Sequence, residues 1–209
     1  MSLRTGVTKG TPKKLQFGAG VYFAGVSYDP KVAPTEEDIK AKLIGATQDG
    51  GTVTIEPEYF VPDLDGVTVA VKTLEFKVAE TAKLETTMAE ITADAIAKSV
   101  IGAVAVTTDK KYDVITSSDL EEGHYYDGFG FYGTYVDGRK IIVIFESALC
   151  TSGLSLEPKN KQNAAFKGTF ECRADIEADD LTKLPYAIFI EKDGTMEQTT
   201  ADQLKAVSK

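Results

Sequence analysis

The amino-acid sequence predicts a mainly β protein, a two-sheet β-sandwich with one flanking α-helix. Residues 164–177 alternate strictly between apolar and polar side chains, which is the period of a half-buried strand. Asp137-Gly138 separates an aromatic, glycine-rich run from a β-branched run, and this dipeptide suits the positive φ angles of a two-residue hairpin turn. Helical spacing is convincing only over residues 92–101. Many strands beside one short helix indicate a core built on sheets.

The N-terminal part of the chain predicts an arm followed by a single domain. Residues 1–14 contain four cations and almost no apolar side chains, so we expect a flexible arm outside the core. A chain of 209 residues suits one core, which we place over residues 15–192. Near its start, the hydroxyl of Thr35 can cap one short helical turn, with Asp38 three residues later.

The next segment predicts two strands and a change of face. Asp49-Gly50-Gly51 marks a tight turn, and residues 52–60 alternate like a half-buried strand. A proline-containing loop follows. Near Lys72 and Thr73 the apolar side chains then change from odd-numbered to even-numbered positions, which indicates a bulge or a crossing between sheets. The odd-numbered residues are Val67, Val69 and Val71, and the even-numbered residues are Leu74, Phe76 and Val78.

The predicted helix has signals at both ends. Thr92 is a natural N-cap because its hydroxyl can accept a free backbone N–H, and Gly102 is placed to end the helix after Ile101. Asp94 and Lys98 form an i, i+4 pair on the solvent side.

The C-terminal part predicts the strand over residues 164–177, a last strand over residues 186–190, and a polar tail over residues 193–209. The expected inward face of the first strand consists of Ala164, Phe166, Gly168, Phe170, Cys172, Ala174 and Ile176. The expected polar face consists of Lys167, Thr169, Glu171, Arg173, Asp175 and Glu177.

Composition excludes several classes of function. Lys and Arg number 23 against 32 Asp and Glu, and a net charge of −9 would repel a phosphate backbone. The longest apolar stretch, residues 140–149, is far shorter than the roughly 20 residues of a membrane-spanning helix, so no span is expected. Cys150 and Cys172 are expected to be free, buried thiols.

No catalytic or cofactor motif stands out, so we expect neither an enzyme nor a bound cofactor or metal. Nucleophilic catalysis would have to use His124, the single histidine, and no serine lies in a G-x-S-x-G elbow. One histidine and two separated cysteines do not make a zinc site. Gly18-Ala-Gly20 is not followed by a helix that could hold phosphate, and Asp63 and Asp65 lack the remaining ligands of a calcium loop.

Three segments resemble the major tail tube proteins of long-tailed bacteriophages. They are LIGATQDGGTVTIEPEY from Leu43, continuing to Gly66; LETTMAEIT from Leu84; and ESAL from Glu146 through NAAFKGTFEC, which starts at Asn163. The resemblance spans roughly residues 15–192 and implies six copies in a ring and rings stacked into a tube, in a phage, prophage or tail-like particle. It also implies assembly in the bacterial cytoplasm, a place in the virion tail, a tape-measure protein as partner, and DNA that passes through without specific binding.

The resemblance also suggests which residues join the copies. The long hairpin with which this family reaches the next ring would fall on about residues 47–66. The candidate stacking residues are Thr47, Asp49, Gly50, Gly51, Glu56, Glu58, Asp63 and Asp65. For the channel wall, the polar face of residues 167–177 is one candidate, because its acids outnumber its bases three to two and a basic wall would retain DNA. The simpler interpretation of that face is an outer, solvated surface.

An alternative is a β-sandwich module that binds carbohydrate or protein through exposed aromatic residues. Its candidates are Tyr125, Tyr126, Phe129 and Tyr132, because aromatic rings stack on sugars and anchor interfaces. Packing of these rings in the core is the favoured interpretation, given how often such side chains are buried.

Overall fold

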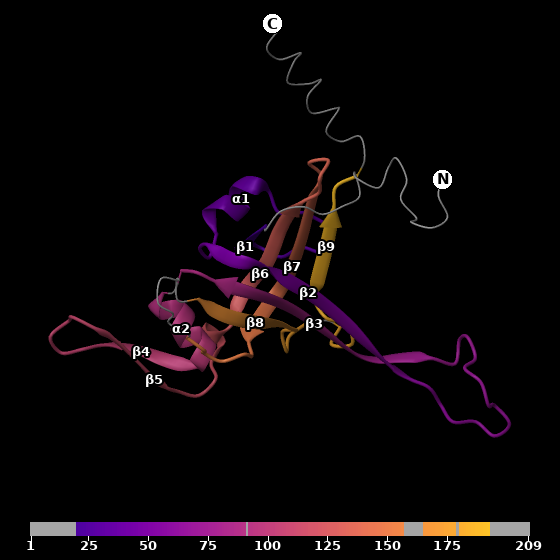
Figure 1. Ribbon diagram of the computed structural model, residues 1–209. Coiled ribbons are helices and arrows are strands. Elements are labelled where there is room, and N and C mark those ends of the chain that lie inside the picture. Colours follow the sequence, from indigo (N-terminus) through magenta and orange to yellow (C-terminus); the bar gives the residue numbers. More distant parts are fainter. Residues whose placement is uncertain (1–19, 91, 157–164, 179, 193–209) are drawn as a thin grey trace, which may run out of the picture.

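The computed structural model describes residues 20–90, 92–156, 165–178 and 180–192 (Figure 1). The elements in chain order are β1 (Val21–Phe23), α1 (Glu36–Ala41), β2 (Thr47–Phe60), β3 (Phe76–Met88), α2 (Ala93–Val100), β4 (Gly102–Val106), β5 (Asp113–Ser117), the short 3-10 turn η2 (Glu122–His124), β6 (Tyr126–Thr134), β7 (Lys140–Cys150), β8 (Phe166–Arg173) and β9 (Tyr186–Ile190). The predicted arm (residues 1–14) and tail (residues 193–209) lie outside the described residues.

Seven strands form one antiparallel sheet that branches at β7. The strand order is β1-β6-β7-β8-β3-β2, and β9 pairs with β7 off this path. The first half of β7 pairs with β9 and its second half with β8, so the branch lies near Glu146. β4 and β5 form a separate two-stranded sheet. The mainly β class is confirmed, whereas the described pairing joins the seven strands in a single sheet.

The main core forms where this sheet curves over itself. Buried side chains from β1, β3, β6, β7 and β8 belong to one cluster, which contains Tyr22, Leu84, Phe129, Phe145 and Phe170 among others. Phe129 of β6 stacks on Phe170 of β8 with ring centroids 4.3 Å apart. A smaller cluster packs Ile39 of α1 against β1, β7 and β9. Both clusters lie in the body of the molecule.

The predicted helices are confirmed with their N-caps, whereas Gly102, which was expected to end α2, is instead the first residue of β4. Thr92 Oγ1 accepts the backbone N–H of Ala95 at 3.2 Å, and Ile101 ends α2 in the left-handed conformation. Thr35 caps α1 in the same way by accepting the N–H of Asp38. The Lys98 ammonium lies 3.9 Å from the Asp94 carboxylate, as the i, i+4 spacing predicts.

Several predicted strands and turns are also confirmed. A turn at Asp137-Gly138 joins β6 to β7, and Gly138 has φ +85°. It is not a two-residue turn, because Tyr135 donates its N–H to the carbonyl of Arg139 and three residues lie between them. β8 covers residues 166–173 of the strand predicted over 164–177, of which Ala164 lies outside the described residues, and β9 covers all of residues 186–190. The two cysteines are free and buried, and burial raises the pKa of Cys172 to about 12.

Other local predictions are wrong. Gly50-Gly51 is no turn, because it lies inside β2, where the register with β3 shifts between Gln48 and Gly51. Residues 67–71 form no strand. The predicted strand over residues 164–177 ends at Arg173, where Asp175 accepts the N–H of Glu177 in a turn, so Ile176 is 88% exposed. The β4–β5 hairpin was not predicted.

Candidate functional site

The most prominent feature of the molecule is a two-stranded arm that projects from the body (Figure 1). β2 and β3 stay paired from Thr47↔Met88, at the body, to Phe60↔Phe76. The side chains of β3 alternate between buried and half-buried from residue 82 to residue 88, whereas residues 76–79 are all exposed. The chain therefore leaves the core near Thr81, and we define residues 56–80 as the long arm.

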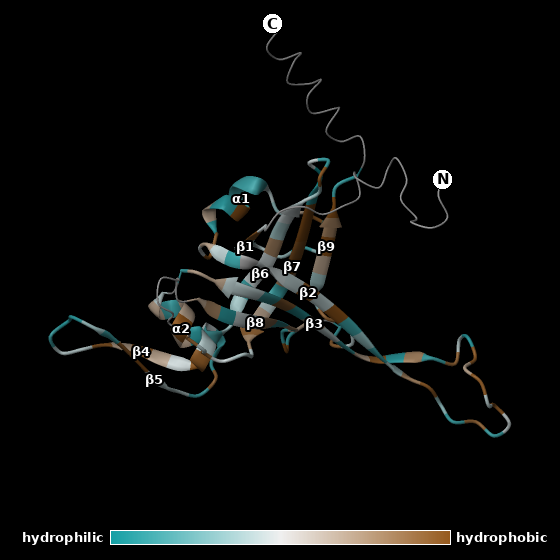
Figure 2. Ribbon diagram, viewed as in Figure 1, coloured by the Kyte–Doolittle hydropathy of each residue, from teal (hydrophilic) through white to brown (hydrophobic). Residues whose placement is uncertain are grey.

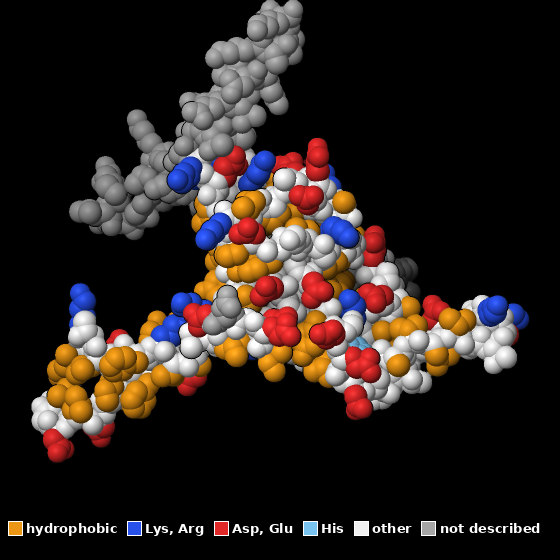
Figure 3. Space-filling model, turned by 180° about the vertical axis from the view of Figure 1, so that it is seen from behind, with side chains coloured by type: hydrophobic (Ala, Val, Ile, Leu, Met, Phe, Trp, Pro, Cys, Tyr) orange, Lys and Arg blue, Asp and Glu red, His pale blue; other side chains and the backbone are white. Residues whose placement is uncertain are grey.

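The long arm is apolar for a segment surrounded by solvent (Figures 2 and 3). Val69 is 71% exposed, Tyr59 59% and Val78 58%. The other exposed apolar residues of the arm are Phe60, Val61, Leu64, Val67, Val71 and Phe76. Monomeric soluble proteins rarely expose contiguous apolar patches beyond a few hundred Å². An isolated two-stranded hairpin is also only marginally stable in water, so this surface has the properties of an interface.

The long arm is acidic as well as apolar. Residues 56–80 contain six Asp or Glu and two Lys. Lys77 pairs with Glu80 at 2.7 Å, and Glu80 also accepts the hydroxyl of Tyr186 on β9 at 3.2 Å. The first contact lies within the arm, and the second joins the base of the arm to the body. Asp63 and Asp65 lie at the exposed tip, where the described residues offer them no cationic partner.

The predicted stacking residues are divided between the body and the arm. Thr47, Asp49, Gly50 and Gly51 belong to the part of β2 that pairs along the body, whereas Glu56 and Glu58 lie on the arm and Asp63 and Asp65 at its tip. The boundaries of the predicted hairpin are therefore wrong. Residues 47–66 cover one strand and the start of the tip, and the returning strand is β3, which ends at Met88.

A second, shorter arm projects from the other side of the body (Figure 1). It is the β4–β5 hairpin, residues 102–117, with register from Gly102↔Ser117 to Val106↔Asp113. Tyr112 is 68% exposed, Val106 61% and Val104 49%. Ser118 fixes the base of this short arm, because its hydroxyl donates to the carbonyl of Ile101 at 3.2 Å.

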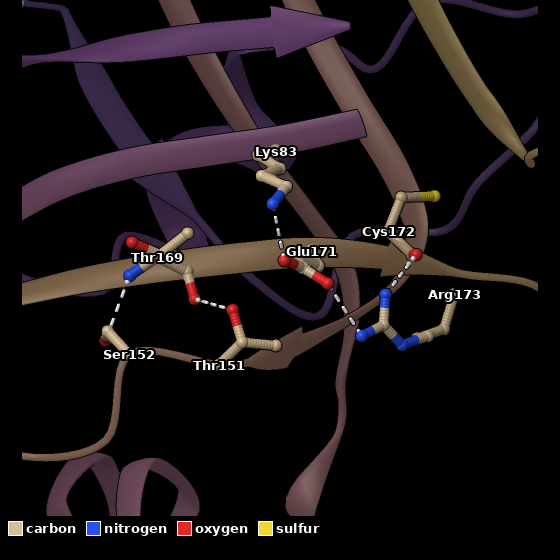
Figure 4. A network of polar contacts seen from close by, with 7 residues as sticks. All are labelled: Lys83, Thr151, Ser152, Thr169, Glu171, Cys172 and Arg173. Atoms are coloured by element: carbon tan, nitrogen blue, oxygen red, sulfur yellow. Dashed lines mark hydrogen bonds and ion pairs between the residues drawn. The ribbon is translucent and has the colours of Figure 1, made fainter. Parts of the chain in front are cut away.

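The polar face of β8 forms a network with the neighbouring strands (Figure 4). The Glu171 carboxylate contacts Lys83 of β3 at 2.9 Å and Arg173 at 2.8 Å, and these two cations lower the pKa of Glu171. Ser152 Oγ accepts the N–H of Thr169 at 3.1 Å, and Thr151 Oγ1 donates to the carbonyl of Thr169.

The charge of this face differs from the sequence prediction. Lys167, Thr169, Glu171 and Arg173 lie on β8, but Asp175 and Glu177 lie beyond its end, so the strand itself has no excess of acid. The cross-strand register continues the face onto β3 and β2. We define the polar sheet face as these β8 residues together with Thr52, Thr54, Glu56, Thr81, Lys83, Glu85 and Thr87. Its three bases balance its three acids.

The aromatic residues of the alternative function lie mostly inside the protein. Phe129 is fully buried and Tyr126 is 7% exposed, and both belong to the main core. Tyr125 and Tyr132 are half-buried, and the Tyr132 hydroxyl donates to Glu36 at 3.0 Å. Tyr126 and Phe129 are therefore not available to stack on a sugar.

His124 has a structural role at the base of the short arm. It is buried, and its Nδ1 accepts the backbone N–H of Glu121 at 3.0 Å. The ring proton is then on Nε2, which lies 3.4 Å from Ser118 Oγ. A histidine that activates a serine must accept its proton, and here the serine hydroxyl donates to Ile101 instead.

Other kinds of site gain no support from the described residues. Among them, no group of three or more His, Cys, Asp or Glu is placed to hold a metal ion. Within the same ranges, no helix is both long and apolar enough to span a membrane. No protein-family model matches the chain, and no curated protein matches it.

Proposed function

We propose that the protein is a structural subunit that assembles with copies of itself, and that the assembly is a bacteriophage tail tube. The observation that carries the proposal is the long arm, whose exposed apolar side chains extend beyond the core on a hairpin that no other described part of the protein covers. A standard protein interface takes about 800 Å² from each partner, and a projecting apolar hairpin contributes to such an area without opening the core.

The sequence resemblance gives this assembly its form. In the proposed tube, six copies close a ring, the long arm of each copy reaches the next ring, and the curved sheet provides the sandwich-like wall around a channel for DNA. The tape-measure protein would be a partner, and the particle would be assembled in the bacterial cytoplasm as part of a virion or prophage tail. The net charge of −9 fits a conduit that DNA crosses without binding.

The proposal is tested by shortening the arm. Phe60 pairs with Phe76, so residues 61–75 can be replaced by Asn-Gly, which closes a two-residue hairpin turn and leaves the body unchanged. We expect wild-type protein at high concentration to give rings and tubes in negative-stain micrographs. The shortened protein should keep its β-rich circular dichroism and lose the tubes.

A control changes an apolar residue elsewhere that is at least as exposed as those of the arm. Ile176 is 88% exposed and lies outside both arms, so Ile176→Asp should leave tubes intact. Wild-type protein that stays monomeric at every concentration would contradict self-assembly. Tubes that survive the shortened arm would contradict the role of the arm.

A further inference from the structure

The short arm resembles the long arm in surface chemistry but differs from it in charge. Both are two-stranded hairpins with exposed apolar side chains, and they project from different sides of one body (Figures 1 and 3). The tip of the long arm, residues 61–75, presents three exposed acids, Asp63, Asp65 and Glu75, and one exposed base, Lys72, so it is net acidic. The tip of the short arm presents Lys110 and Lys111, whose ammonium groups have no carboxylate partner among the described residues.

The acids of the short arm leave those lysines available. The Asp109 carboxylate accepts the hydroxyl of Thr107 and the backbone N–H of Lys111, and these hydrogen bonds lower its pKa. Asp109 is therefore engaged in holding the turn. Asp113, opposite Val106 at the end of the hairpin ladder, is the other acid of this arm.

We propose that the short arm of one copy receives the long arm of the next copy. The occupant is a second copy of this chain, because one molecule presents both halves of the match, apolar strands on each hairpin and opposite charges at the two tips. The protein carries a net charge of −9, so two copies repel each other except where a local cation or an uncharged surface meets the acid. Strands β4 and β5 offer such a surface, because Asp113 is their single charged residue.

The geometry also determines the kind of assembly. A contact between two different surfaces on different sides of the subunit is heterologous, so each copy in a pair still has one arm free for a further partner, and the copies either close into a ring or extend as a chain. This inference rests on the proposed function, in which the long arm joins copies, and it adds the surface that receives the arm.

A charge exchange between the two tips tests the contact. We expect Lys110→Glu with Lys111→Glu to weaken self-association about tenfold at low salt, and Asp63→Lys with Asp65→Lys to weaken it similarly. All four changes together should restore association to within about threefold of wild type, because the pairs are re-formed with reversed sign. Sedimentation velocity over a concentration series gives the association constants.

A second cation pair controls for the change in net charge. Lys31 and Lys42 are exposed on the body, so Lys31→Glu with Lys42→Glu alters net charge by the same amount away from the short arm. Combined with the Asp63 and Asp65 changes, it should not restore association. Equal rescue by both cation pairs, or no rescue by either, would overturn the proposed contact. If the shortened long arm still abolished tubes, the proposed function would stand in either case.

Discussion

The hydroxyl of Tyr22 on β1 lies 3.2 Å from the backbone carbonyl oxygen of Glu85 on β3. Three strands separate β1 from β3 in the sheet order, so this hydrogen bond joins two distant parts of the sheet. Gly51 of β2 lies beside this hydrogen bond. A Cβ added there would be 1.7 Å from Tyr22 Oη and 2.4 Å from the Glu85 carbonyl oxygen.

Gly51→Ala should therefore destabilise the protein. Tyr22 is buried and the Glu85 carbonyl is backbone, so neither can move aside without a wider shift, and we expect a loss of about 1–3 kcal/mol in the free energy of unfolding. Urea unfolding followed by circular dichroism measures it. Gly123→Ala is the control, because a Cβ at that position meets nothing within 4 Å. Equal stability of the two variants would contradict the close contact.

The same substitution at two phenylalanines should separate folding from assembly. Phe170 is fully buried and stacks on Phe129, so Phe170→Ala should lower the free energy of unfolding by about 3–5 kcal/mol. Phe76 is 54% exposed at the outer end of β3, so Phe76→Ala should change stability by less than about 1 kcal/mol while weakening self-association. Urea unfolding and sedimentation velocity on both variants check this. A large loss of stability in the Phe76→Ala variant would instead show that this ring stabilises the fold of the single subunit.

Sequence periodicity predicted the parts of the fold whose side chains face the body's own core. β8 alternates because Phe166 and Phe170 are buried while Lys167 and Glu171 are not, and α2 is marked by its Thr92 cap. The same pattern wrongly predicts a strand at the tip of the long arm, where Val67 and Val69 alternate with polar or small residues but are exposed and do not face the core. Periodicity reports which side chains avoid water, and it does not distinguish a core from a surface that meets another molecule.

Glycine was the other source of error. The sequence Asp49-Gly50-Gly51 predicts a turn, but Gly51 is required by the approach of Tyr22, a residue almost 30 positions earlier in the chain. The β4–β5 hairpin was missed because residues 102–117 are uncharged over most of their length and carry no Asn-Gly or Asp-Gly turn. The two arms of the candidate site thus became recognisable only when the strand pairing and the exposure of their side chains were known.

Glu36 should make the free energy of unfolding depend on pH in the acidic range. Its carboxylate contacts Lys140 Nζ at 2.7 Å and the Tyr132 hydroxyl at 3.0 Å, and these partners lower its pKa from 4.5 to about 2. A lowered pKa stabilises the folded protein above the unfolded value, and this contribution is lost as the pH falls from about 4.5 to about 2. Because the side chain is 40% exposed, solvent screening limits the contribution to about 0.5–1 kcal/mol.

Glu36→Gln should accordingly reduce the free energy of unfolding at pH 7 and leave it unchanged near pH 2. Urea titrations at several pH values compare the two proteins. Glu37→Gln changes a neighbouring exposed carboxylate and should not reproduce the difference. A constant difference between wild type and Glu36→Gln at all pH values would show that the ion pair is not its cause.

The last prediction concerns the polar sheet face as the wall of the DNA channel. With its charges balanced, this face gives a duplex few unpaired cations to hold, whereas each added cation that neutralises a phosphate strengthens binding by counterion release. Thr52 and Thr81 are exposed on this face and lie outside the Lys83–Glu171–Arg173 network. Thr52→Lys with Thr81→Lys should therefore preserve tubes but trap DNA inside them, so that duplex present during assembly survives nuclease digestion.

The same charge added by Ile176→Lys with Leu181→Lys, on exposed residues away from the face, should leave any bound duplex open to digestion. Equal digestion of the duplex in both variants would contradict the prediction that the polar sheet face lines the channel. It would not test tube formation itself, because another face of the same sheet could then line the channel.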